Sequence, residues 1–145
     1  MNPIATTTRI PLAAHLRTEA GNELQATLAE LLDLQLVGKQ MHWTVAGPLF
    51  RPLHEQLDEF VDAWRDLGDT VAERAVTVGH FPDGQADAVA KASEFGRLEV
   101  GVIEDHMVVF ELTRRVATVA ERCRERMDRR ARTITPGAAA LHSHR

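Results

Sequence analysis

The segment from residue 51 to residue 79 carries one unbroken apolar stripe, which constrains the fold more than any other feature of the chain. Its apolar residues recur at intervals of four, three, four, three and four positions, the period of one face of an α-helix. They are Leu53, Leu57, Phe60, Trp64, Leu67 and Val71. The pattern predicts a long amphipathic helix that opens at Pro48 or Pro52, buries these six side chains in a core and ends near Gly79.

Two further long helices are predicted on either side of this one. The first covers residues 16–44, and its apolar positions are Leu24, Leu28, Leu31, Leu34 and Met41. The other covers residues 95–131, with a stripe formed by Val109, Leu112, Val116, Val119 and Cys123. A short helix is predicted in the connection, at ADAVAKAS, and no segment alternates with the period of two that indicates a sheet. The fold class is therefore all-α, a helical bundle.

A chain of 145 residues is long enough for one domain with a real core. We predict a flexible N-terminal segment at 1–15, a bundle domain at 16–132 and a flexible C-terminal tail at 133–145. Pro136 and Gly137 end any helix there, and the last ten residues have no amphipathic face. Three long helices without a fourth would leave an apolar groove exposed.

Composition excludes several classes of protein. The single cysteine, Cys123, rules out an internal disulfide framework and a cysteine-rich zinc site, and it agrees with a cytoplasmic location. No stretch approaches the roughly 20 apolar residues of a membrane span. A formal charge of −4 shows that the molecule as a whole is not a basic nucleic-acid binder.

The polar residues of the 51–79 helix include two pairs of potential metal ligands. His54 and Asp58 lie four residues apart, as do Asp69 and Glu73. Eleven residues, about three helical turns, separate the pairs, so all four side chains share one flank, displaced by one position from the apolar stripe. The pairs lie roughly 16 Å apart along the axis, whereas metal–ligand bonds are only about 2 Å long.

One ion cannot touch both pairs of a single helix, but two copies of the helix, antiparallel across a two-fold axis, solve this. Each dimer would then hold two identical sites. His42, at the end of the first helix, could complete the set. Two imidazoles and carboxylates without thiolate suit iron, manganese or zinc. The competing interpretation is that these are incidental polar residues on solvated helix faces, and Asp69 could instead form an ion pair or orient a ligand.

The segment HWTVAGPLFRPLHEQLDEFVDAWRDLGDTVAERAVTVGHFPDG resembles the signature of the Dps family, the DNA-binding proteins from starved cells, which are ferritin-like. The match is strong over the first two long helices and weak over the third. The resemblance implies ferroxidase ligands at His42, His54 and Asp58 from one subunit and at Asp69 and Glu73 from its neighbour. It further implies a hollow dodecamer that oxidises Fe(II), preferentially with hydrogen peroxide, stores a ferric mineral and so limits oxidative damage.

The chain differs from the family pattern in two respects. The family has a fourth long helix that closes the bundle, which this sequence lacks, so a non-catalytic assembly or nucleoid protein, or a truncated inactive member, is the alternative. DNA binding in the family often rests on lysine-rich termini. This chain has only Lys39 and Lys91, neither of them terminal, and its arginine-rich stretch at 114–132 is typical of a solvated helix face. DNA as a partner therefore has weak support.

Overall fold

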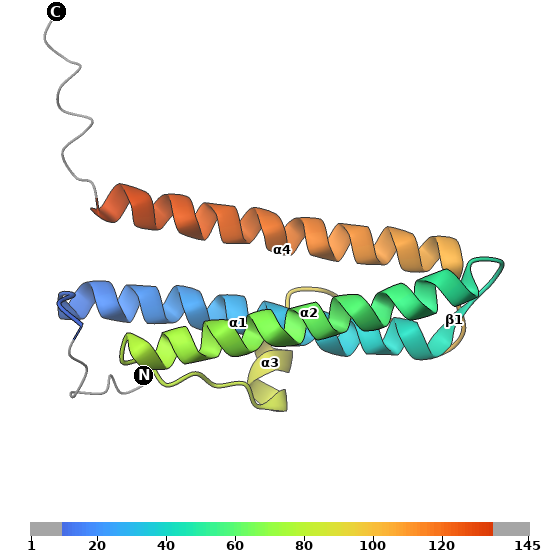
Figure 1. Ribbon diagram of the computed structural model, residues 1–145, viewed down its shortest axis with the longest axis horizontal. Helices are drawn as coiled ribbons and strands as arrows, with labels where there is room; N and C mark the ends of the chain where they lie inside the picture. The colour runs from blue at the N-terminus through green and yellow to red at the C-terminus, as the bar shows by residue number, and fades with distance from the viewer. Residues whose placement is uncertain (1–9, 135–145) are drawn as a thin grey trace, which may run out of the picture.

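The computed structural model describes residues 10–134, and over this range the chain is a bundle of three long helices with a short one in the connection (Figure 1). The helices are α1 (Ala14–Thr44), α2 (Phe50–Thr77), α3 (Ala86–Ala92) and α4 (Asp105–Ile134). Figure 1 shows α1, α2 and α4 lying side by side, with α3 in the link between α2 and α4. The predicted all-α bundle with three long helices is confirmed.

The segment from residue 93 to residue 104 differs from the prediction, because α4 begins at Asp105 and not at residue 95. This segment instead carries Phe95, which is buried in the core, and Gly101, whose φ of 154° is open to glycine far more readily than to other residues. It ends in β2 (Ile103–Glu104), which pairs in parallel with β1 (Val45–Ala46). The prediction of no sheet was therefore wrong here, since two-residue strands are too short to show alternation.

The core consists of two clusters along the bundle. The first contains Leu31, Leu34, Val61, Trp64, Phe95 and Val119, and the second contains Met41, Val45, Leu57 and Val108. Helices α1 and α2 approach closely at Gly38, where an added Cβ would lie 2.8 Å from Val61 Cγ2 and 2.9 Å from Trp64 Cζ3. This contact sets the spacing between the two helices that carry the predicted ligands.

The buried face of α2 is rotated from the predicted stripe. Leu57 and Trp64 are buried as expected, but Phe60 is 38% exposed and Leu67 53% exposed. The predicted Leu53 and Val71 pack partly buried against the core, and the further buried positions are Val61, Gly68 and Ala75. This face points at α1. Phe60 and Leu67 lie some 60–80° around the helix from Leu57, on a side that no other long helix of residues 10–134 covers.

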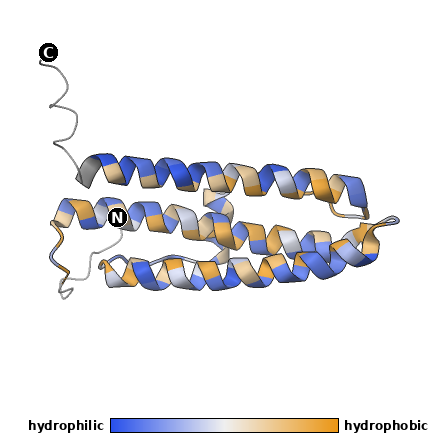
Figure 2. Cartoon of the chain, turned by 45° about the horizontal axis from the view of Figure 1, so that its top comes forward, coloured by the Kyte–Doolittle hydropathy of each residue, from blue (hydrophilic) through white to orange (hydrophobic). Residues whose placement is uncertain are grey.

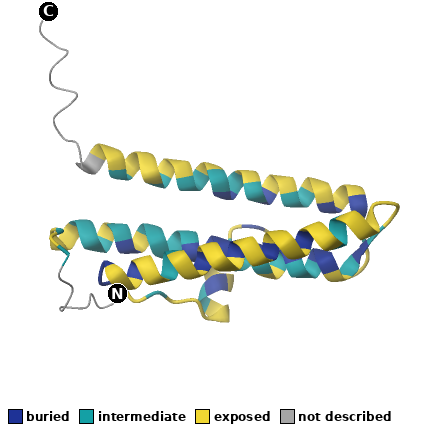
Figure 3. Ribbon diagram, viewed as in Figure 1, coloured by how far each residue is buried: buried dark blue, intermediate teal, exposed yellow. Residues whose placement is uncertain are grey.

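The stripe predicted for α4 is largely confirmed, since Val119 is buried and Leu112, Val116 and Cys123 pack partly buried against the first cluster. The predicted core residue Val109 is 43% exposed, whereas its neighbour Val108 is fully buried. Figure 3 shows the result, with buried residues confined to one side of α4 and exposed residues on the rest. Phe60, Leu67 and Val109 were predicted to be buried, but within residues 10–134 no further helix packs over them.

The C-terminal half of α4 is attached to α1 through ion pairs. Figure 2 shows that this half is largely hydrophilic. Its arginines meet a row of glutamates on α1, in the pairs Arg122–Glu30, Arg126–Glu30, Arg126–Glu23, Arg129–Glu23 and Arg130–Glu19. The antiparallel order of the two series fixes the register of α4 along α1.

The ends of the chain lie largely outside the described residues. This applies to the predicted N-terminal segment up to residue 9, to Pro136 and Gly137, and to the rest of the tail. The division into 1–15, 16–132 and 133–145 therefore stays a prediction, although α1 already begins at Ala14. None of the helices in residues 10–134 has an apolar stretch long enough to cross a membrane.

Candidate metal centre

His42, His54 and Asp58 come together at one end of the bundle. His42 lies in the last turn of α1, and His54 and Asp58 lie in the first turns of α2. A short turn after β1 joins the two helices, with Gly47 at a φ of 118°. Asp105, at the start of α4, accepts the Leu49 N–H at 2.9 Å and so fastens this turn to the rest of the bundle.

The two imidazole rings are stacked, with centroids 3.6 Å apart and planes 20° apart. Each ring also binds the backbone of the other residue. His42 Nδ1 lies 2.8 Å from the His54 carbonyl oxygen, and His54 Nδ1 lies 2.9 Å from the His42 carbonyl oxygen. A carbonyl only accepts, so both Nδ1 atoms must carry the proton. In the neutral rings this leaves Nε2 with a free lone pair, the state that a histidine ligand requires.

Asp58 is the exposed member of the group and is held by Lys39. Its Oδ1 accepts from Lys39 Nζ at 2.6 Å and lies 3.3 Å from His42 Nδ1. The hydrogen bond from Lys39 is the main cause that lowers the pKa of Asp58. Slight burial opposes this effect, whereas the charge of Lys39, and those of His42 and His54 when their rings are protonated, add to it. The carboxylate is thus ionised at neutral pH, but it is engaged by a lysine.

Asp69 and Glu73 do not join this group within one chain. Both are exposed on α2, and Asp69 lines a separate hollow beside Arg65, Asp66 and Gly68. Among residues 10–134 no three histidine, cysteine, aspartate or glutamate side chains are arranged to hold a metal ion. A single chain therefore presents a half-site of three potential ligands and, about 16 Å along the same helix, a pair of free acids.

Apolar side chains surround the half-site and are exposed in the single chain. Trp43 is 67% exposed, and Phe50, which stacks on the His54 ring at 5.1 Å, is 45% exposed. Sequence reasoning did not assign a role to Lys39 or Phe50. A signal was present, since Lys39 lies one helical turn before His42 and Phe50 one turn before His54.

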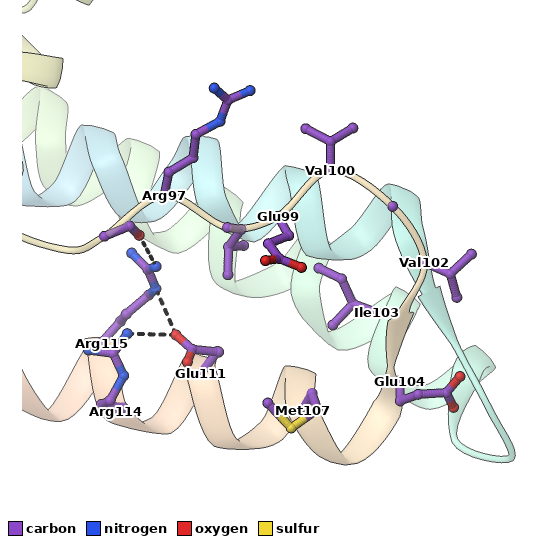
Figure 4. A pocket seen from close by; sticks show the side chains of 13 residues that line it. Arg97, Glu99, Val100, Val102, Ile103, Glu104, Met107, Glu111, Arg114 and Arg115 are labelled. Carbon is purple, nitrogen blue, oxygen red and sulfur yellow. Dashed lines mark hydrogen bonds and ion pairs between the residues drawn. The ribbon is translucent and has the colours of Figure 1, made fainter.

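A second polar cluster lies on α4 and differs in chemistry. It lines a cavity of about 500 Å³ beneath the 96–104 segment (Figure 4). Glu111 accepts from Arg114 at 2.6 Å and from Arg115 at 3.4 Å, and Arg115 donates to the Gly96 carbonyl at 2.5 Å. Because the arginines neutralise the carboxylate, this cluster fastens the 96–104 segment to α4 and does not resemble a metal site.

The sequence of this chain is similar to a known domain family and to several known proteins. The family model of the ferritin-like domain matches residues 21–135. The DNA protection during starvation protein of Agrobacterium fabrum is 32% identical over 121 residues, covering 83% of this chain and 75% of that protein. DNA protection during starvation protein 2 of Deinococcus radiodurans is 38% identical over 104 residues, covering 72% of this chain. That match spans only 43% of the length of the Deinococcus protein.

Solved structures agree with the sequence relatives. The Dps92 crystal structure from Deinococcus radiodurans superposes with a TM-score of 0.79 at 34% identity, covering 88% of this chain and 77% of that one. The tetragonal form of Mycobacterium smegmatis Dps superposes with a TM-score of 0.81 at 28% identity, covering 87% and 76%.

Proposed function

Because the chain belongs to the Dps family of ferritin-like proteins, we propose that it binds Fe(II) at sites shared between two copies and oxidises it there. In each site His42, His54 and Asp58 of one copy face Asp69 and Glu73 of the other. The protein is then a ferroxidase, an oxidoreductase that acts on metal ions. We place it in the cytoplasm, where it would store iron and limit oxidative damage.

The observation that carries this proposal is the state of the two histidines. Their Nδ1 atoms donate to each other's backbone carbonyls, which orients both rings and leaves both Nε2 atoms free to bind a metal. The free acids three turns along α2 supply the missing ligands only if a second α2 lies antiparallel to the first.

The chemistry follows from the charge of the donor set. Three carboxylates favour Fe(III) over Fe(II), because the higher charge gains more from the same negative groups. Two Fe(II) ions lose one electron each. Hydrogen peroxide accepts both electrons together with two protons, its O–O bond breaks, and two water molecules form. The ferric product then hydrolyses and releases protons, which favours deposition as a mineral. We propose a closed homo-oligomeric shell, a dodecamer, as the container for this mineral.

DNA is not part of the proposal. On α4, Arg122, Arg126, Arg129 and Arg130 are paired with glutamates of α1, so they offer phosphate little unneutralised charge. A gel-shift titration at low salt should show no retardation.

The test compares Fe(II) oxidation in the wild type with a His54→Ala/Asp58→Ala variant, followed by ferric absorbance after addition of hydrogen peroxide. The matched control is Asp62→Ala, which removes an exposed acid from the same helix outside the site. We expect oxidation at least tenfold slower in the double variant and unchanged in the control. Equal rates in all three proteins would leave the alternative, a non-catalytic assembly protein.

A further inference from the structure

Lys39 forms an ion pair with Asp58, the one charged ligand of the half-site. Its Nζ lies 2.6 Å from Asp58 Oδ1, and its side chain is 31% exposed, so it is partly sheltered beside the buried His42. The same carboxylate oxygen lies 3.3 Å from His42 Nδ1, which is the protonated nitrogen and not the one that binds a metal. Asp58 must therefore turn away from Lys39 and His42 Nδ1 before it can bind an ion together with the histidines.

The charges of the half-site cancel. The two imidazoles are neutral when they bind a metal, Asp58 contributes one negative charge, and Lys39 contributes one positive charge. A divalent cation that enters one isolated chain thus meets three ligands whose single negative charge is cancelled by Lys39. Asp69 and Glu73 of a second copy add two negative charges, which balance a divalent cation.

From this balance we propose that Lys39 is an electrostatic interlock that makes metal binding depend on the partner's carboxylates. The inference rests on the proposed function and adds a positioning residue to it. Lys39 competes with the metal for Asp58, so the half-site of one chain holds an ion weakly. Only the assembled site, with Asp69 and Glu73 from the second copy, attracts the ion strongly enough to displace the lysine.

If Lys39 has this role, removal of its charged group should strengthen metal binding. The Lys39→Met variant keeps the length and packing of the aliphatic stem but frees Asp58. Two effects then act in the same direction, loss of a competing ion pair and loss of repulsion between Lys39 and the metal. For a partly exposed pair we expect binding about tenfold tighter than in the wild type. Lys39→Arg keeps the charge and should bind like the wild type.

The experiment measures Co(II) binding by calorimetry and by the absorption bands of bound Co(II), which does not require catalysis. Four proteins form a cycle: the wild type, Lys39→Met, Asp69→Asn/Glu73→Gln and the combination of all three changes. His54→Ala/Asp58→Ala, which lacks two ligands of the half-site, is measured beside them as the control. Loss of the two acids should weaken binding about a hundredfold in the wild type and clearly less in the Lys39→Met background. Light scattering on each protein shows whether assembly is unchanged.

The outcomes separate the two proposals. If Lys39→Met binds Co(II) no more tightly than the wild type, while Asp69→Asn/Glu73→Gln and His54→Ala/Asp58→Ala weaken binding, the interlock is refuted and the shared site stands. Weaker binding in Lys39→Met would show that the lysine orients Asp58, which also refutes the interlock. If neither His54→Ala/Asp58→Ala nor Asp69→Asn/Glu73→Gln changes binding, the proposed function itself fails.

Discussion

Glu30 holds two arginines of α4 and is the most buried of the α1 glutamates that pair with α4. The residue is only 7% exposed. Its Oε2 accepts from Arg126 Nη1 at 2.5 Å, and its Oε1 accepts from Arg126 Nη2 at 2.9 Å and from Arg122 Nη1 at 3.1 Å. The hydrogen bond to Glu30 is also the main cause that raises the pKa of Arg126. We expect Glu30→Ala to loosen the C-terminal half of α4.

The magnitude follows from the burial of the three partners. Removal of one partner from a buried ion pair costs about 3–5 kcal/mol, because the remaining charge stays in a poorly solvated place. Here the Arg126 side chain is 13% exposed and stays largely buried, whereas Arg122 at 28% exposure can turn to water and to Glu94. With this discount we expect a loss of about 2–4 kcal/mol in the free energy of unfolding.

Urea unfolding followed by circular dichroism measures this loss, and a double-mutant cycle with Arg126→Ala isolates the pair. The double variant Glu30→Leu/Arg126→Met should be less destabilised than Glu30→Ala alone, since apolar side chains leave no uncompensated charge. A coupling energy below about 0.5 kcal/mol between Glu30 and Arg126 would refute the reasoning, because it would place the pair in the range of ordinary surface ion pairs.

Two further perturbations test the packing and the charge of the bundle. Gly38→Ala places a Cβ 2.8 Å from Val61 Cγ2, so it should destabilise the protein by about 1–3 kcal/mol and lower the melting temperature. An unchanged melting temperature would show that α1 and α2 can move apart without loss of stability. The pKa of Glu111 lies below its ordinary value, chiefly because of the hydrogen bond from Arg114. Since a depressed pKa stabilises the folded state above the unfolded pKa, this contribution is present at neutral pH and is lost as the pH falls through the folded value. Urea unfolding should therefore show a steeper loss of stability below about pH 5 in the wild type than in Glu111→Gln, and identical slopes would contradict the assignment.

The helical architecture was predictable because periodicity extends over many turns. The stripes on α1 and α2 identified two helices to within a few residues, and Leu57, Trp64 and Met41 are buried as predicted. The rotation of the buried face was not predictable from one helix alone. Phe60 and Val109 are apolar and correctly spaced, but whether they are covered depends on elements that other parts of the chain must supply.

The proximity of His42, His54 and Asp58 was predictable, whereas the hydrogen bonds that hold their side chains were not, and their role as ligands stays a prediction. Helical spacing alone placed His54 and Asp58 on one flank, and the structure brings His42 to them. The contact of Lys39 with Asp58 was not predicted, because lysine is not a usual metal ligand and the candidate residues were chosen by ligand type. The start of α4 was missed because the 95–104 segment contains enough apolar residues to resemble a helix, although it is held by the hydrogen bond from Arg115 to the Gly96 carbonyl and by a two-residue parallel pair.

The reciprocal bonds between His42 and His54 have a consequence for local motion. Each imidazole is held by a peptide group twelve residues away, so fraying at the end of α1 would release both rings together. Capture of an ion should accordingly suppress local opening at the end of α1 and at the start of α2 as one cooperative unit. Amide hydrogen exchange would report this as equal slowing at the end of α1 and the start of α2, with a separate slowing around Asp69 and Glu73 and little change near the start of α1.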